Sequence, residues 1–228
     1  FAAPVRSLAE AQALAANPYD IVFVHTGTSA TAPYASNWQF QADNQILVGA
    51  GSTLELATAS CGFRQFFNTG AAGAYPTSAY PVLTSTGTAI TLRNGAIVDH
   101  LQLRNAPAST IQAGIAAGPA LTGGANVSDV RMAGSNAPGQ AGILLEGVPS
   151  GDVNFYNMSV SNMNRGLVVD GGAANVAFQG TISATASPGA IVTVQNNTGG
   201  TVNVNTTAGT LDTPIARNTA VGPPLAIL

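Results

Sequence analysis

The sequence predicts an all-β fold in which short strands wind into a solenoid of stacked coils. Two sequence elements recur at a common spacing, and strand-sized apolar segments are bounded by Gly, Asn, Ser and Pro. No stretch after residue 20 has a helical pattern long enough for a βαβ crossover. Because one coil of this size cannot bury its own apolar face, successive coils must stack and share an interior.

The first recurring element is a short apolar strand that begins with a small residue. Its five copies start 26, 28, 24 and 23 residues apart. Alternate side chains of a strand point to opposite faces, so we expect two apolar rows inside the tube, one led by Ile90 and one by Leu92. The copies are TAITL at 88–92, GIAA at 114–117, GILLE at 142–146, GLVVD at 166–170 and GAIVTV at 189–194.

The second recurring element lies between the copies of the first and begins with Val. Its copies start at Val98, Val127, Val153, Val176 and Val202, which are 29, 26, 23 and 26 residues apart. We expect the first four valines to form one interior column, backed by Leu103, Met132 and Met158. Asn or Asp precedes three of the valines, at 126, 152 and 175, and these residue types suit tight corners.

Composition excludes several classes of protein. Only 7% of the 228 residues are charged, against about 25% in an average protein. The chain has seven Arg, no Lys and a net charge of −3, which does not supply the clustered cations that nucleic-acid binding needs. An apolar content of 46% argues against disorder, and no apolar run approaches the roughly 20 residues of a membrane helix.

The start of the chain differs from the repeats. Residues 6–17, RSLAEAQALAAN, predict a helix with Ser7 as N-cap and Glu10 completing a capping box. A turn follows, and Ile21–Val24 predicts a strand. Because an open solenoid end exposes core and unpaired strand backbone, we expect the helix to cap the first coil.

This opening resembles that of secreted bacterial proteins of the pectate-lyase-like superfamily. The resemblance is carried by the helix, the Pro-Tyr-Asp turn and IVFVHTGT at 21–28, and NQILVGAGST at 44–53 is similar to a second early coil. It implies a right-handed parallel β-helix with a short N-terminal capping helix, located outside a bacterial cell. These motifs specify a fold and not a reaction. The chain begins with Phe1, which indicates a processed product or a fragment.

We expect one β-helix domain over residues 1–212, with the capping helix and turn at 6–20, and a C-terminal tail at 213–228. Residues 57–85 fit the repeat poorly and form a long excursion rich in Phe and Tyr, either a flap on the tube or a ligand surface. The tail is expected to cap the last coil, join a further domain or dock on a neighbouring copy. The single cysteine, Cys61, cannot form an intrachain disulfide and is interpreted as a buried thiol.

Two polar pairs are the candidate catalytic groups. Glu146 and Asp170 occupy the same place on adjacent coils, where two carboxylates can bind Ca²⁺ or divide acid and base roles. His100 and Asp129 each follow a column Val by two residues and can form a base with its orienting partner. For both pairs, solvated or structural polar groups are the competing interpretation. No nucleophile completes a triad.

The favoured hypothesis is a structural or adhesive β-helix module of a bacterial cell surface, part of a larger protein or of a self-associating assembly, with no cofactor. One alternative is a polysaccharide lyase or glycoside hydrolase acting on an acidic polysaccharide, with Ca²⁺ as its candidate cofactor. The other is a carbohydrate-binding module. Its candidate ligand-binding residues are Trp38, Phe66, Phe67, Tyr75 and Tyr80.

Overall fold

The chain is a parallel β-solenoid with one short N-terminal helix, as predicted. The structure, a computed structural model, describes residues 5–26, 32–52, 55–58, 62–65, 80–105, 113–135, 137–183, 191–206, 216–218 and 225–227. The elements are α1 (Leu8–Leu14), β1 (Ile21–Val24), β2 (Tyr34–Ala35), β3 (Trp38–Gln39), β4 (Ile46–Gly49), β5 (Glu55–Thr58), β6 (Gly62–Gln65), β7 (Val82–Ser85), β8 (Ile90–Thr91), β9 (Ala96–Asn105), β10 (Ala113–Ala117), β11 (Ala125–Ala133), β12 (Ala141–Val148), β13 (Asp152–Ser161), β14 (Arg165–Gly172), β15 (Asn175–Ser183), β16 (Val192–Asn197), β17 (Val202–Thr206), β18 (Ala216–Asn218) and β19 (Leu225–Ile227).

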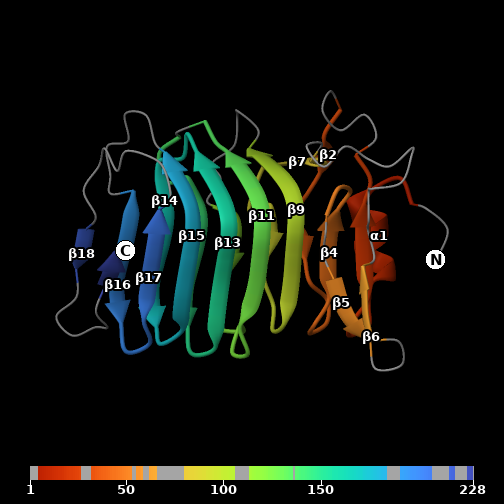
Figure 1. Cartoon of the computed structure of the whole chain (residues 1–228). Coiled ribbons are helices and arrows are strands. Elements are labelled where there is room, and N and C mark those ends of the chain that lie inside the picture. Colours follow the sequence, from red (N-terminus) through yellow and green to blue (C-terminus); the bar gives the residue numbers. More distant parts are fainter. Residues whose placement is uncertain are drawn as a thin grey trace.

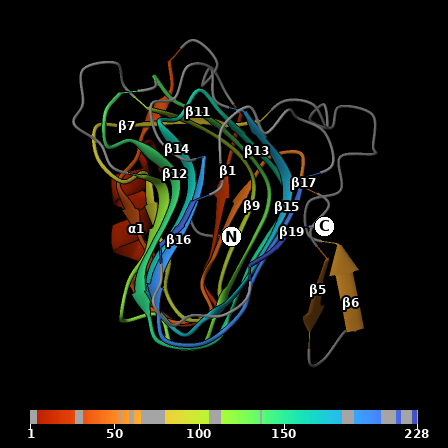
Figure 2. The same cartoon turned by 90° about the vertical axis from the view of Figure 1, so that its left-hand side faces the viewer.

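Two parallel sheets form the walls of the solenoid (Figure 1). The first has the order β1-β4-β9-β11-β13-β15-β17-β19, with β7 pairing β9 and β2 pairing β7. The second has the order β18-β16-β14-β12-β10-β8-β3. From β8 to β19, consecutive strands of the chain therefore lie in the second and the first sheet in turn. Each coil pairs with the coils before and after it. The antiparallel hairpin β5–β6 stands off the outer face of the first sheet (Figure 2).

The long strands of the first sheet bend, so two sheets make three walls. In β9, residues 97–99 pair with β4, whereas residues 102–105 pair with β7. His100 lies between these segments with a φ of 56°, and Asp129 in β11 and Asn157 in β13 have φ values of 50° and 52°. A single residue in the left-handed backbone region bends the strand sharply, which extended backbone cannot do. Figure 2 shows the bent strands along the solenoid axis.

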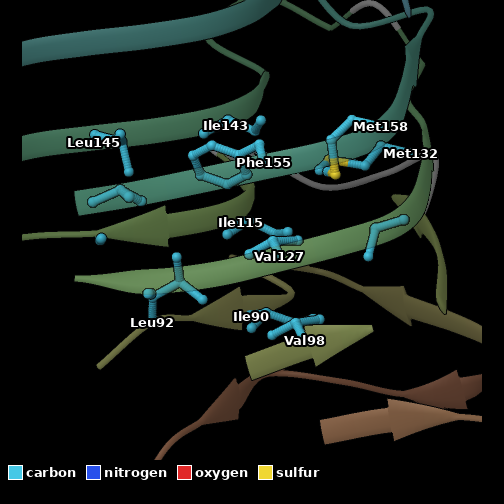
Figure 3. Packing of buried hydrophobic residues seen from close by; sticks show 14 of the residues in the cluster. Ile90, Leu92, Val98, Ile115, Val127, Met132, Ile143, Leu145, Phe155 and Met158 are labelled. Atoms are coloured by element: carbon cyan, nitrogen blue, oxygen red, sulfur yellow. The ribbon is translucent and has the colours of Figure 1, made fainter. Parts of the chain in front are cut away.

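The interior row of the second sheet confirms two of the four predicted steps, Ile115 to Ile143 and Ile143 to Leu167. The first and last steps are each 25 residues, where the repeat predicts 26 and 23. Ile115 pairs with Ile90 and with Ile143, and Leu167 continues the row to Val192. Side chains from the opposite sheet meet them in one shared apolar core (Figure 3). The core therefore runs through successive coils, as the repeat predicts.

The predicted valine column is wrong at one step. Val127 pairs with Val98 but also with Phe155, 28 residues onward, and Val153 pairs with Ala125 instead. Met132 likewise pairs with Leu103 and Val160, so Met158 is not its partner. The error is a slip of two residues. Such a slip keeps every side chain on its face, so alternation along the strand cannot detect it.

Helix α1 caps the start of the second sheet. The predicted capping box is present, with Ser7 and Glu10 each bonding the other's backbone N–H. Gln12 Oε1 accepts a hydrogen bond from the backbone N–H of Gln39 in β3, the first strand of that sheet. The buried Gln45 side chain donates to the carbonyls of Ala15 and Asn17 and so ties the end of the helix to the first sheet.

The shared interior makes a testable prediction about stability. Ile143 is fully buried between Ile115 and Leu167, so Ile143→Ala removes apolar contacts and leaves a cavity. We expect a loss of about 2–5 kcal/mol in the free energy of unfolding, measured in guanidinium chloride. The control is Thr193→Ala, at a partly exposed outer position of the same sheet, with an expected change of about 0.5 kcal/mol or less. Equal losses in both variants would contradict a shared interior.

Candidate functional site

The predicted pair His100 and Asp129 meets at the corner of the first sheet. His100, Asp129 and Asn157 follow one another at this corner in three successive coils, all with positive φ, and we call them the corner ladder. Each non-glycine residue in this conformation costs about 1–3 kcal/mol and persists only where surrounding contacts hold it. The ladder stops after Asn157, because β13 has two residues where β15 has only Gln179.

Asp129 accepts three hydrogen bonds at this corner. His100 Nδ1 lies 2.5 Å from Asp129 Oδ2, the Tyr80 hydroxyl donates to Oδ1 at 2.6 Å, and Asn157 Nδ2 donates to Oδ1 at 2.9 Å. We call Asp129 with these three donors the Asp129 hub. The donors come from three coils and Asp129 comes from a fourth, so one carboxylate joins four layers of the solenoid.

The hub shifts the acidity of two of its members. Burial alone would raise the pKa of the Asp129 carboxyl, but the hydrogen bonds from His100 and Tyr80, with the charges of His100 and Arg131, lower it below its ordinary value. Burial, followed by the bond to Asp129 and its negative charge, raises the pKa of the Tyr80 hydroxyl to about 12. Asp129 is therefore held as a charged acceptor and Tyr80 as a neutral donor.

The His100 ring is enclosed on several sides. Its side chain is only 5% exposed, and the Tyr80 ring stacks on it at 4.0 Å with an interplanar angle of 10°. Arg131 lies over the Tyr80 ring, 4.0 Å from its centroid. His100 Nε2 has no hydrogen-bond partner and faces Gly51, where an added Cβ would lie 2.6 Å from it. The ring is packed as a wall component, without an open face for a substrate.

A second carboxylate lies beside the hub. Asp99 is buried, accepts a hydrogen bond from the Ser128 hydroxyl at 2.5 Å, and also accepts one from Ser52. Ser52 and Ser128 were not among the predicted site residues. The signal was available for Ser128, which directly precedes Asp129 and pairs with Asp99 in register. Ser52 lies too far from Asp99 in the sequence for any spacing rule to find it.

The predicted pair Glu146 and Asp170 lies in register on β12 and β14. Asp170 is nevertheless bonded to the following coil, with Gln195 Nε2 at 2.7 Å from one carboxylate oxygen and Asn196 Nδ2 at 2.8 Å from the other. Glu146 is exposed. The strand spacing brings the two residues together, while the amides of the next coil occupy both oxygens of Asp170.

The aromatic candidates have different places. Trp38 is only 2% exposed and packs edge-on against Phe40, so it offers no surface platform. Tyr80 belongs to the Asp129 hub. Phe66, Phe67, Tyr75 and Cys61 lie outside the described residues. Tyr156, which the sequence analysis did not single out, is 44% exposed on the outer wall beside the corner ladder.

A cavity of 360 Å³ lies beside the N-terminal cap. Leu8, Ala9 and Gln12 of α1 line it together with residues 35–38 and 84–86. Ser36 and Ser85, two of its lining hydroxyls, already hydrogen-bond to neighbouring chain atoms. Helix α1 and the first coils line the cavity together, and its lining includes no residue of the two polar pairs.

The described part of the chain has neither a metal-binding cluster nor a helix that could cross a membrane. There, no three His, Cys, Asp or Glu residues gather closely enough to hold a metal ion. No described helix has the length and apolar character needed to cross a membrane. Glu146 and Asp170 thus stand as a pair, without a third carboxylate, among these residues.

Comparisons with protein-family models, curated proteins and solved structures found no significant match. The inference of function therefore rests on the geometry of this chain. Three features carry it: the Asp129 hub, the bonded Asp170 and the buried Trp38.

The raised pKa of Tyr80 predicts how its contribution to stability changes at alkaline pH. Its pKa is raised from 10.0 to about 12, so its contribution to stability is complete below pH 10 and is lost as the pH rises to about 12. We expect Tyr80→Phe to be less stable than the wild type at pH 9, with a difference that shrinks between pH 10 and 12. Denaturant unfolding at a series of pH values measures it. Tyr156→Phe is the exposed control, and a pH-independent difference for Tyr80→Phe would contradict the prediction.

Proposed function

We propose that the chain is a structural module of a bacterial cell surface, a stiff β-solenoid within a larger protein. The observation that carries the proposal is the Asp129 hub. The residues that would serve a catalytic site are used to bond one coil to the next. The bacterial and extracellular setting is supported only by the resemblance of residues 6–28 and 44–53 to secreted β-helix proteins.

The geometry of His100 supports a structural role over a catalytic one. A general base must bring a free nitrogen within hydrogen-bond reach of the substrate proton. In His100, Nδ1 is bonded to Asp129, and Nε2 lies against Gly51 under a stacked Tyr80. Neither nitrogen has an open approach, and Asp129 has three donors of its own.

The same bonding between coils recurs where the chain enters the strands of the first sheet. Asn175 Nδ2 donates to Asp152 of the preceding coil, and Asn175 Oδ1 accepts from Thr201 of the following one. Asn94 Oδ1 accepts hydrogen bonds from the backbone N–H groups of Thr122 and Gly123 in the next coil. Short polar side chains thus act as bridges between layers, which explains how a chain with few charges has a wall rich in Asn, Ser and Thr.

The structural role makes a prediction that separates it from catalysis. Asp129→Ala leaves His100, Tyr80 and Asn157 without their acceptor, so we expect a loss of about 1–3 kcal/mol in the free energy of unfolding. Glu146→Ala, at an exposed carboxylate, is expected to change it by about 0.5 kcal/mol or less. Chemical denaturation measures both.

The same proteins are assayed for cleavage of acidic polysaccharides with and without Ca²⁺. We expect no turnover by the wild type. Turnover that disappears in Asp129→Ala or Glu146→Ala, at a pH where the variant is still folded, would replace the structural proposal with the enzyme alternative. Glycan binding without turnover would favour the binding-module alternative, for which Tyr156 is the exposed aromatic residue on the described wall.

A structural module can belong to a larger protein or assemble with copies of itself. The N-terminal cap favours the larger protein. Helix α1 occupies the place above β3 that a further strand of the second sheet would need. A helix is about 10 Å across, whereas coils are spaced by about 4.8 Å, so a second copy cannot continue the stack there.

We therefore expect light scattering to give the mass of one chain, 22.7 kDa, at all concentrations tested. Negative-stain images should show short particles and no filaments. Mass that grows with concentration, with rods in the images, would show that copies associate despite the cap and would restore the assembly hypothesis.

A further inference from the structure

We propose that the Asp129 carboxylate is an acid-operated latch, in which one proton on Asp129 releases Tyr80, His100 and Asn157 together from the corner of the solenoid. The proposal rests on the convergence of distant segments on one titratable group. Tyr80 precedes β7, His100 lies in β9, Asp129 in β11 and Asn157 in β13. No other described carboxylate joins as many segments of the chain.

The neighbourhood of the latch contains few other charges. From β9 come His100 and Asp99, and Asp99 is bonded to Ser52 and Ser128. From β11 comes Arg131, whose guanidinium lies over the Tyr80 ring. The turn after β4 contributes Gly51, and β13 contributes the neutral Asn157 and Tyr156. Among these described groups, Asp129 alone bonds the His100 ring.

Protonation of Asp129 removes more than one bond. The carboxylate loses its charge, so the hydrogen bonds from Tyr80 and Asn157 weaken. The buried His100 ring would then lose its contact with a charged carboxylate at Nδ1, while its Nε2 already lies beside Gly51 without a partner.

The direction of the pH effect follows from the contacts. Asp129 has its pKa lowered in the folded chain, so its contribution is complete above the ordinary value of 3.8 and is lost as the pH falls through the folded value. The latch is therefore closed at neutral pH and opens only in acid. The second sheet has no His–carboxylate ion pair among its described strands, so we expect opening to be confined to the corner.

Hydrogen exchange followed by mass spectrometry tests the latch on the whole chain. Exchange is measured at pH 6 and pH 3 and corrected for the intrinsic exchange rate at each pH. We expect β7 and the second half of β9 to lose protection at pH 3 relative to β12 and β14, with opening that increases by up to about tenfold for each pH unit between the ordinary pKa of 3.8 and the lower folded value. Unchanged relative protection of β7 would overturn the proposal.

Two variants identify the responsible group. Asp129→Asn removes the titrating carboxyl while keeping a residue that tolerates positive φ, so the acid-dependent change in β7 should disappear. Asp170→Asn, also bonded between coils but without a His partner, should keep the wild-type acid response. An acid response of Asp129→Asn equal to that of the wild type would rule out the latch.

A third variant serves if Asp129→Asn does not fold. Tyr80→Phe keeps a ring that can stack on His100 but has no hydroxyl to donate to Asp129. Exchange of the β7 amides should then already be faster at pH 6, and its further increase at pH 3 should be smaller than in the wild type. A full acid response in Tyr80→Phe would show that Tyr80 is not held by the carboxylate.

Discussion

The structure depends on parallel hydrogen bonding between neighbouring coils. Each wall strand pairs with the equivalent strand of the coils beside it, and these strands are too short to be stable alone. This pairing fixes the register, and the register places the apolar residues of each coil over those of the next. The same repeat stacks polar residues outside the tube. An Asn, Ser or Asp on one coil therefore meets a donor or acceptor on the next, as Asn175 does with Asp152 and Thr201.

Much of the fold could be predicted because periodicity and side-chain alternation are local properties of the sequence. The interior row of Ile90, Ile143 and Leu167 and the capping box of Ser7 and Glu10 are both confirmed. The Val127–Val153 step failed because a two-residue slip leaves alternation unchanged. The bend at His100 was missed because positive φ at His has no sequence signature comparable to that of Gly.

Only those contacts of the candidate site that join equivalent positions of neighbouring coils could be predicted from the sequence. His100 and Asp129 are 29 residues apart, one coil, and the repeat itself places them together. Tyr80 lies in the segment 57–85 that departs from the repeat, and Ser52 precedes the first repeat copy at 88–92, so no period relates them to Asp129 and Asp99. Their contacts required coordinates. They also changed the interpretation of the pair, because they enclose the ring that a catalytic role would need exposed.

The end of the corner ladder at Asn157 has a consequence for the evolution of this chain. Up to β13, successive coils are bound by specific side-chain matches at the corner, and deleting one coil would separate His100 from Asp129 or Asp129 from Asn157. Beyond β13, where β15 lacks the corner residue, neighbouring coils do not depend on that match. Duplication or loss of a coil there would lengthen or shorten the rod by about 4.8 Å and leave the earlier layers intact. At this corner, the solenoid thus combines coils that are joined by specific side-chain matches with coils that are not.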